Sequence, residues 1–253
     1  AINIKRATTT QAMSSDAPAA LSSYNLIAID LPPFGFSSSD PVKGYWRNEQ
    51  AKRIREFLDW RGLEDVILVG HSYGAGPLTE AAMTGAKGVR KLVIIDGVLN
   101  INETKTPKQQ NSFFNPQTVN FALLGVVHSK ALVKKQLEGF VYKKDHIDYA
   151  LTELYMKSFK VKGTSQKLAD WLVGYMTDPL GYVSTRESSY FTLTQPVRVI
   201  WGDKDTLTPP HLADELVKLV PDSRLYMLKD VGHIPMIEDY AQFDDALHRA
   251  IRE

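Results

Sequence analysis

Short, largely apolar runs bounded by turn-forming residues recur along the chain and predict its strands. Several of these runs are rich in Val and Ile and lack a polar residue at every second position. Continuous apolar runs of this length are typical of strands that are buried on both faces of a parallel sheet. The expected strands are Tyr24–Asp30, Val66–Val69, Leu92–Ile95, Val197–Trp201 and Arg224–Leu228.

The stretches between these runs follow the 3.6-residue period of amphipathic helices. In Asn48–Leu63 the apolar side chains fall on one face, with Arg and Glu on the other. Helices are also expected directly after Val69, over Leu212–Leu219 and over Ala241–Ile251, with a weaker one over Gln11–Ser23. Residues 1–10 are weakly patterned and allow one strand. Because strands and helices alternate, the fold class is α/β, with a mostly parallel, doubly wound sheet and right-handed crossovers.

The segment between Gly97 and Thr194 breaks this alternation, since it has no strand pattern. It is polar and Lys-rich, with apolar residues at helical spacing, such as Leu151, Leu154, Tyr155 and Phe159. A chain of 253 residues fits one large core with an insertion better than two equal domains. We therefore expect residues 1–97 and 195–253 to form the core and residues 98–194 to form a helical cap, or lid.

Composition narrows the classes of partner. A net charge of +1 gives no field that would attract nucleic acid or a membrane surface, so small molecules are the expected partners. The chain has no cysteine, which excludes disulfides, thiolate metal sites and a cysteine nucleophile. No segment approaches the ~18 apolar residues of a membrane span, and residues 1–6 contain no signal-peptide core. On this basis we expect a cytoplasmic protein without membrane insertion.

The candidate chemistry centres on Ser72, in the stretch DVILVGHSYGAG that follows the second predicted strand. Gly70 and Gly74 bracket the serine at the spacing of a nucleophile elbow, a tight turn that tolerates only small neighbours. Such short strings also arise by chance in loops. A second alternative is a dinucleotide-binding turn, since Gly70, Gly74 and Gly76 follow a strand and Asp96 ends the next one.

A catalytic serine needs a base within hydrogen-bond reach and an acid that holds the base in the right tautomer. The loops after the later strands supply candidates, because Asp203 and Asp205 follow Trp201, and His233 follows Leu228. The chain order is then Ser, Asp, His, which differs from the orders of the best-known serine proteases. Asp203 is an alternative to Asp205, although an aspartate there also suits a turn.

These marks together resemble the α/β-hydrolase family, and in particular its capped serine-hydrolase branch of esterases, carbon–carbon bond hydrolases and haloperoxidase-like enzymes. The matching stretches are IAIDLPPFGFSSSD, VILVGHSYGAG, LVIIDG, VRVIWGDKDTLTP and DVGHIPMIED. The resemblance implies an α/β-hydrolase fold with its helical cap after the sixth family strand. It also implies a nucleophile Ser72, an acid Asp205, a base His233, and an oxyanion donor in the backbone N–H of Tyr73, without metal or organic cofactor.

Two further points follow from this resemblance. A short-chain dehydrogenase would carry a Tyr-x-x-x-Lys pair, and no Tyr of this chain has Lys four residues later, which disfavours the dinucleotide alternative. His71 lies beside the serine on the opposite side of the expected turn. We expect it to pack or to hydrogen-bond locally.

The chain also departs from the family pattern. The family usually has an earlier strand that ends in His-Gly and donates a second oxyanion N–H, but no His-Gly occurs here. About two dozen residues precede Tyr24, too few for the usual three strands and a helix. We therefore expect that an internal piece near Thr10 and Gln11 is missing, and the second donor is left open. Smaller departures are Pro33, where the family tends to have glycine, and Pro77 in the helix after the elbow.

The expected function is a serine hydrolase that cleaves small apolar carboxylic esters through an acyl-enzyme on Ser72. A serine at the elbow disfavours the dehalogenase and epoxide-hydrolase branches, which use aspartate there. Large side chains in the cap, such as Phe113, Phe114, Phe140, Trp171 and Tyr175, suit an apolar ligand. The alternatives are carbon–carbon cleavage of diketone-type substrates and a non-catalytic member that only binds its ligand.

Overall fold

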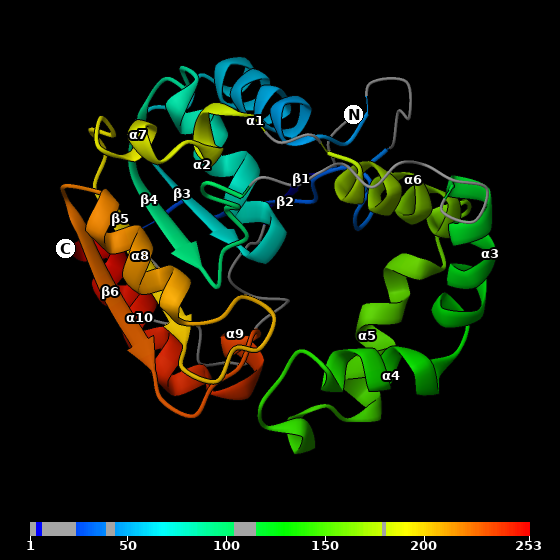
Figure 1. Ribbon diagram of the computed structural model, residues 1–253. Helices are drawn as coiled ribbons and strands as arrows, with labels where there is room; N and C mark the ends of the chain where they lie inside the picture. Colours follow the sequence, from blue (N-terminus) through cyan, green and yellow to red (C-terminus); the bar gives the residue numbers. More distant parts are fainter. Residues whose placement is uncertain (1–3, 7–23, 39–43, 104–114, 179–180) are drawn as a thin grey trace.

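Four parallel strands form the central sheet in the computed structural model, which describes residues 4–6, 24–38, 44–103, 115–178 and 181–253. The order is β3 (Val66–His71), β4 (Val89–Ile95), β5 (Val197–Gly202) and β6 (Ser223–Leu228). Leu92 pairs with Val197 and Ile95 with Ile200, so the strands before and after the inserted segment lie side by side. This confirms the expected parallel α/β sheet, and the carboxyl ends of β3 and β4 point towards the helical segment (Figure 1).

The strand expected over Tyr24–Asp30 is shorter than its apolar run suggested. It forms only β2 (Ile27–Ile29), which is half-buried and pairs antiparallel with β1 (Ile4–Arg6). Among the described residues these two strands form a sheet of their own, and β3 pairs only with β4. The expectation of a fully buried strand there was wrong, because no described strand covers the second edge of β2.

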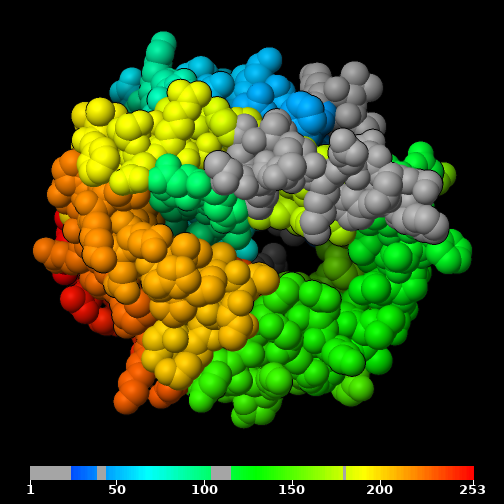
Figure 2. All heavy atoms as spheres, in the orientation of Figure 1, coloured from blue at the N-terminus to red at the C-terminus, as the bar shows by residue number. Residues whose placement is uncertain are grey.

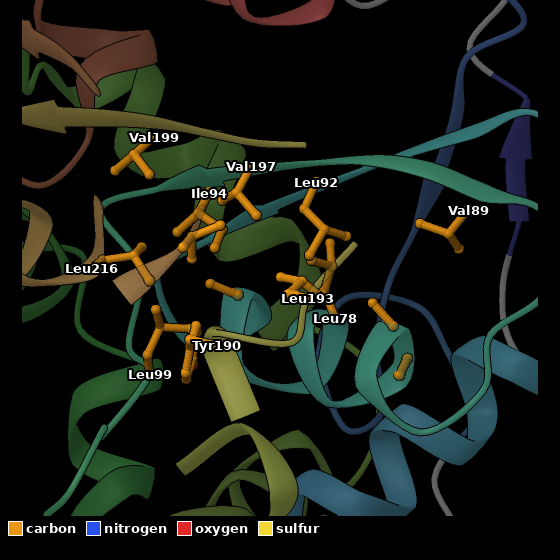
Figure 3. Close-up of a cluster of buried hydrophobic side chains, with 14 of the residues drawn as sticks. Leu78, Val89, Leu92, Ile94, Leu99, Tyr190, Leu193, Val197, Val199 and Leu216 are labelled. Carbon is orange, nitrogen blue, oxygen red and sulfur yellow. The ribbon is translucent and has the colours of Figure 1, made fainter. Parts of the chain in front are cut away.

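Helices cover both faces of the four-stranded sheet. The bounds are α1 (Arg47–Arg61), α2 (Ala75–Met83), α8 (His211–Leu219), α9 (Pro235–Glu238) and α10 (Tyr240–Arg252). Alternate residues of β4 divide between the two faces. Leu92 and Ile94 pack with α1, α2 and α8 (Figure 3), whereas Val93 and Ile95 pack with α10. The apolar run of β4 is thus explained by burial on both sides.

In the part of the segment between β4 and β5 that the structure describes, all regular elements are helices or 3₁₀ turns. It contains α3 (Pro116–Val127), α4 (Lys130–Glu138), α5 (Tyr149–Phe159), α6 (Thr164–Met176) and α7 (Glu187–Tyr190), with short 3₁₀ turns η3 (Lys144–His146) and η4 (Val183–Thr185). Helices α3 to α6 lie beside the sheet and form a separate arc (Figure 1). Figure 2 shows the surface hollowed between this arc and the residues that follow β5. The helix expected over Gln11–Ser23, together with Phe113 and Phe114, lies outside the described residues.

Candidate active site

Ser72 lies at a sharp turn between β3 and α2. Its φ of 52° is in the left-handed region, and the 3₁₀ turn η2 (Ser72–Gly74) leads directly into α2. A Cβ at Gly70 would lie 2.9 Å from the Cα of Ala75, so a side chain there would collide with the turn. At Gly74 nothing lies within 4 Å of such a Cβ, and the expected steric need for glycine holds at Gly70 but not at Gly74. The strained serine is typical of a nucleophile elbow.

Pro77 is compatible with this turn. It is the third residue of α2, where backbone N–H groups have no partner within the helix, so its missing donor costs little. The other departure, Pro33, belongs to the loop after β2, whose aromatic residue Phe34 lies 5.8 Å from the ring of Tyr73. This loop therefore lies against the elbow even though β2 and β3 are not paired.

The side chains of Ser72, His233 and Asp205 form a continuous hydrogen-bonded series. His233 Nε2 lies 2.7 Å from Ser72 Oγ, and His233 Nδ1 lies 2.7 Å from Asp205 Oδ2. Both His233 and Asp205 are buried, with 3% of their surface exposed. Three residues from three loops thus meet, in the geometry that serine hydrolases use to activate a hydroxyl.

Asp205 is held as a carboxylate by several donors. Its Oδ1 accepts the backbone N–H groups of Leu207 at 2.8 Å and Thr208 at 3.0 Å, while Oδ2 also accepts the Thr208 hydroxyl. Burial acts to raise the pKa of Asp205, but hydrogen bonds from His233 and Thr208 outweigh it and hold that pKa below the ordinary value. The part that Thr208 plays was not expected from the sequence.

Asp203, the alternative acid, has other partners. Its Oδ1 accepts the N–H of Asp230 at 2.7 Å, and its Oδ2 forms an ion pair with Lys204 at 2.8 Å. It therefore ties the loop after β5 to the loop after β6. The histidine is in contact with Asp205 and not with Asp203 in the described structure.

The loop that carries His233 is fixed to the helical segment. The N–H of His233 donates to the carbonyl of Phe140 at 2.9 Å. Glu238, which is 1% exposed, accepts the N–H groups of Gly232, Tyr142 and Lys143 at 2.7 to 3.0 Å. This buried carboxylate explains why the motif DVGHIPMIED contains an acid after the histidine.

His71 also contacts the histidine loop. Its Nε2 lies 2.7 Å from the carbonyl oxygen of His233, and the two rings are 5.1 Å apart. Burial lowers the pKa of His71 to about 4, so its imidazole is neutral at pH 7 and Nε2–H donates to that carbonyl. His71 packs and hydrogen-bonds as expected, but its partner is 162 residues away in the chain and not in the same turn.

Aromatic side chains gather around Tyr73, the residue whose N–H is the expected oxyanion donor. The rings of Phe34, Trp171 and Tyr175 lie 5.8, 5.2 and 5.8 Å from that of Tyr73. The Tyr73 hydroxyl donates to the carbonyl of Tyr45 at 2.8 Å, which turns the side chain away from bulk water. Helix α6 thus places two aromatic rings beside the elbow.

Three other types of site can be assessed. In the described part of the chain no group of three or more His, Cys, Asp or Glu residues could hold a metal ion. Within those same ranges, no helix combines the length and apolar character that crossing a bilayer requires. Asp96, the acidic residue of the dinucleotide alternative, is completely buried and hydrogen-bonds the N–H of Gly202, so it cannot reach a ribose.

Comparison with known proteins places this geometry in a family. The model of the alpha/beta hydrolase fold matches residues 13–240. The chain belongs to the alpha/beta hydrolase family. This hydrolase is 27% identical to Lipase 3 of Moraxella sp. (strain TA144) over 240 residues, which cover 90% of this chain and 72% of that protein. It is 29% identical to Lipase 1 of Psychrobacter immobilis over 221 residues, 86% of this chain and 66% of that one.

Solved structures agree on the fold of the hydrolase. A meta-cleavage product hydrolase from Pseudomonas fluorescens IP01 superimposes with a TM-score of 0.74 at 19% identity, covering 92% of this chain and 81% of that one. An esterase from Exiguobacterium antarcticum has a TM-score of 0.68 at 18% identity, covering 90% and 81%. These structures show the fold, and the family match together with the two lipase relatives shows that the protein is a hydrolase enzyme.

Proposed function

We propose that this hydrolase cleaves small apolar carboxylic esters with Ser72 as nucleophile, His233 as general base and Asp205 as the acid that orients it. The observation that carries the proposal is the unbroken series from Ser72 Oγ through both ring nitrogens of His233 to Asp205, with both distances at 2.7 Å. No feature of packing requires a strained serine, a buried histidine and a buried carboxylate to meet at the end of a sheet.

The mechanism follows from this arrangement. As Ser72 Oγ attacks the ester carbonyl carbon, its proton passes to His233 Nε2, and Asp205 stabilises the imidazolium that forms. The proton then goes to the departing alcohol, which leaves an acyl group on Ser72. A water molecule, deprotonated by the same nitrogen, releases the acid and restores the serine. The N–H of Tyr73 and the positive end of η2 and α2 stabilise the oxyanion.

The substrate class is proposed from the surroundings of the serine. The rings of Phe34, Tyr73, Trp171 and Tyr175 form an apolar, aromatic wall. In this proposal residues 98–194 are the lid, and residues 1–97 and 195–253 are the core. Such a wall favours small acyl or aryl esters over polar polymers. The lipases among the relatives support ester chemistry.

A second candidate reaction is hydrolysis of a carbon–carbon bond in a diketone. It is kept because the solved meta-cleavage product hydrolase shares the fold, and because a curated relative of Pseudomonas putida, 23% identical over 221 residues, carries the name 2-hydroxy-6-oxononadienedioate/2-hydroxy-6-oxononatrienedioate hydrolase 2. The same three residues would serve both reactions. The two reactions differ in the substrate that fits beside the aromatic wall.

The nucleophile is tested by labelling with a fluorophosphonate followed by peptide mass spectrometry. We expect a single adduct on Ser72, no adduct in Ser72→Ala, and a loss of turnover of about 10³–10⁶-fold in that variant. The Asp203→Asn variant is the matched control and should label like the wild type. An adduct on another residue would contradict the assignment.

The substrate is tested by comparing kcat/KM for short-chain, long-chain and aryl esters with that for a vinylogous diketone. We expect short-chain or aryl esters to be best. A diketone value more than about tenfold above every ester, equivalent to ~1.4 kcal/mol, would replace the ester assignment by carbon–carbon cleavage. Tight binding of apolar esters without Ser72-dependent turnover would instead identify a binding protein.

A further inference from the structure

Asp96 is a buried carboxyl group that the proposed mechanism does not use. It follows directly after β4, has a φ of 42°, and exposes none of its surface. Its N–H donates to the carbonyl of Ile200 at 3.1 Å, and its Oδ1 accepts the N–H of Gly202 at 2.9 Å. The side chain is therefore fixed by β5 at the end of the sheet where the three candidate residues meet.

The second oxygen, Oδ2, lacks a donor. No N–H or O–H group of the described residues reaches it, although it is completely buried. A buried carboxylate without a donor on one oxygen is costly, and such groups become neutral instead. A carboxylate oxygen needs a hydrogen-bond donor, whereas the O–H of a neutral Asp96 carboxyl needs a hydrogen-bond acceptor.

That acceptor is Asp205. The Asp205 carboxylate raises the pKa of Asp96 both by its charge and by a side-chain hydrogen bond between the two groups. Asp205 already receives the donors that keep it charged: Leu207 N–H, Thr208 N–H, the Thr208 hydroxyl and His233 Nδ1–H. Two adjacent carboxyl groups in a buried site share one proton, because both cannot be charged. Asp205 has the donors of a carboxylate, so the proton belongs to Asp96.

The charged groups with the largest effect on Asp96 raise its pKa and so favour its neutral form. Burial, which the Gly202 N–H only partly offsets, and the negative Asp205 raise the pKa of Asp96 from 3.8 to about 9. Glu238 on α9 adds a smaller effect of the same sign. His233 faces Asp205 and not Asp96, and the largest effects on the pKa of Asp96 come from burial, Gly202, Asp205 and Glu238.

We propose that Asp96 is a positioning residue, a neutral carboxylic acid that donates its proton as a hydrogen bond to Asp205. The series then runs Asp96, Asp205, His233, Ser72, and the inference rests on the proposed function of the last three. Asp96 touches neither substrate nor reacting atoms. It holds Asp205 from the side of β4 while Thr208 holds it from its own loop. When Asp96 loses its proton, the hydrogen bond becomes a repulsion between two carboxylates.

The kinetic test uses two substitutions and a control. Asp96→Asn keeps an acceptor for Gly202 and a donor for Asp205 but cannot ionise, whereas Asp96→Leu removes the donor. With a p-nitrophenyl ester, wild-type kcat should fall through a group near pH 9, and this alkaline fall should be absent in Asp96→Asn. Asp96→Leu should lose about 10–100-fold in kcat at about pH 7.5, with KM changed less than about threefold. The control Asp245→Asn, at an exposed carboxylate on α10 that pairs with Arg249, should keep the wild-type pH profile.

A substrate-free measurement separates this inference from the proposed function. Below its raised pKa the folded protein holds a proton that the unfolded chain releases above pH 3.8, so wild-type stability falls as pH rises towards 9. Asp96→Asn lacks this loss. The melting temperature of Asp96→Asn minus that of the wild type should therefore increase by at least about 4 °C from about pH 5 to pH 9.

Each outcome decides a different claim. A melting difference that does not change with pH means that Asp96 is charged, and overturns the inference. A pH-dependent melting difference combined with an unchanged alkaline fall in Asp96→Asn means that its proton does not position Asp205, and also overturns it. If no ester is hydrolysed and Ser72 is not labelled, the proposed function fails, while the melting comparison still determines the protonation of Asp96.

Discussion

Replacing Asp205 by asparagine should nearly abolish turnover, for a reason that the hydrogen bonds around it make specific. Oδ1 accepts two backbone N–H groups, from Leu207 at 2.8 Å and Thr208 at 3.0 Å, and these donors cannot turn away. The amide oxygen of the introduced asparagine must therefore occupy the Oδ1 position. Its NH₂ group then faces His233 Nδ1 at the position now held by Oδ2.

This orientation imposes the wrong tautomer on the histidine. An NH₂ group can only donate, so His233 Nδ1 would accept and its proton would move to Nε2. A protonated Nε2 cannot take the proton of Ser72, from which it is 2.7 Å away. In a serine protease the same substitution lowers kcat about 10⁴-fold with the geometry intact, which corresponds to about 5 kcal/mol of transition-state stabilisation.

The assay is kcat for p-nitrophenyl butyrate at about pH 7.5, together with the rate of fluorophosphonate labelling. Asp205→Asn should lose about 10⁴-fold in kcat, and Asp203→Asn should stay within about threefold of the wild type. Both variants should melt as folded proteins. If Asp205→Asn stays within about tenfold of the wild type while Asp203→Asn is inactive, the acid has been assigned to the wrong aspartate.

Two further predictions concern stability. His71 has a pKa of about 4 in the folded protein against 6.5 when unfolded, so it contributes stability above pH 6.5 that is lost towards pH 4. The lost free energy of unfolding is about 3 kcal/mol, at 1.36 kcal/mol per pKa unit. Urea titrations at several pH values should show this loss in the wild type but not in His71→Gln, whose amide keeps a hydrogen-bond donor. The same dependence of unfolding free energy on pH in both proteins would contradict the prediction. Gly202→Ala should destabilise the fold by about 3 kcal/mol or more, because its Cβ would lie 2.3 Å from the carbonyl oxygen of Gly232. The control is Gly125→Ala on α3, where a Cβ meets open space, and thermal melts should show it to be neutral or stabilising. Equal melting temperatures for these two variants would show that the loop before His233 yields without cost.

The sheet was predictable wherever burial alone decides the pattern. Strands β4 and β5 carry continuous apolar runs where helices pack on both faces. The run of β3 was expected to be buried in the same way but is only partly buried, with Val69 48% exposed. All three runs predicted where the strands lie to within a few residues. The helix expected over Asn48–Leu63 was likewise confirmed, as Arg47–Arg61. The run at Tyr24–Asp30 was misleading because its apolar residues depend on a neighbouring strand, and a sequence pattern does not show which strand pairs with which.

The candidate site was predictable where a residue follows a strand within a motif that resembles the family pattern. The elbow serine, the acid after β5 and the histidine after β6 were found in this way, and the structure places them within hydrogen-bond distance of one another. The residues that support them were not found. Thr208 contacts Asp205 through the turn of the loop they share, and Asp96 lies near it through the pairing of β4 with β5. Nothing in their local sequence distinguishes the two from ordinary turn residues.

The division between the two sheets bears on the second oxyanion donor. In the part of the chain that the structure describes, β1 and β2 pair only with each other, which leaves one edge of β2 and one edge of β3 unpaired, with Val69 48% exposed. Unpaired edges on both sides are costly, and one inserted strand would satisfy both. Thr10 and Gln11, where we expect a missing internal piece, lie between β1 and β2 in the chain.

A piece restored at that place would begin after β1 and end before β2, and its strand would pair with the free edges of β2 and β3. The loop after such a strand would reach the elbow beside Tyr73 and would supply the second oxyanion N–H, which is worth about 10²–10³-fold in kcat. Sequencing the gene across the codons of Thr10 and Gln11 tests this directly. Additional codons with strand character should be found there, and a chain that contains them should turn over esters faster by that factor. A reading frame in which the two codons are adjacent would mean that the protein works with the Tyr73 donor and its helix dipole, and its kcat should then be lower by the same factor of about 10²–10³ than that of a hydrolase with both donors.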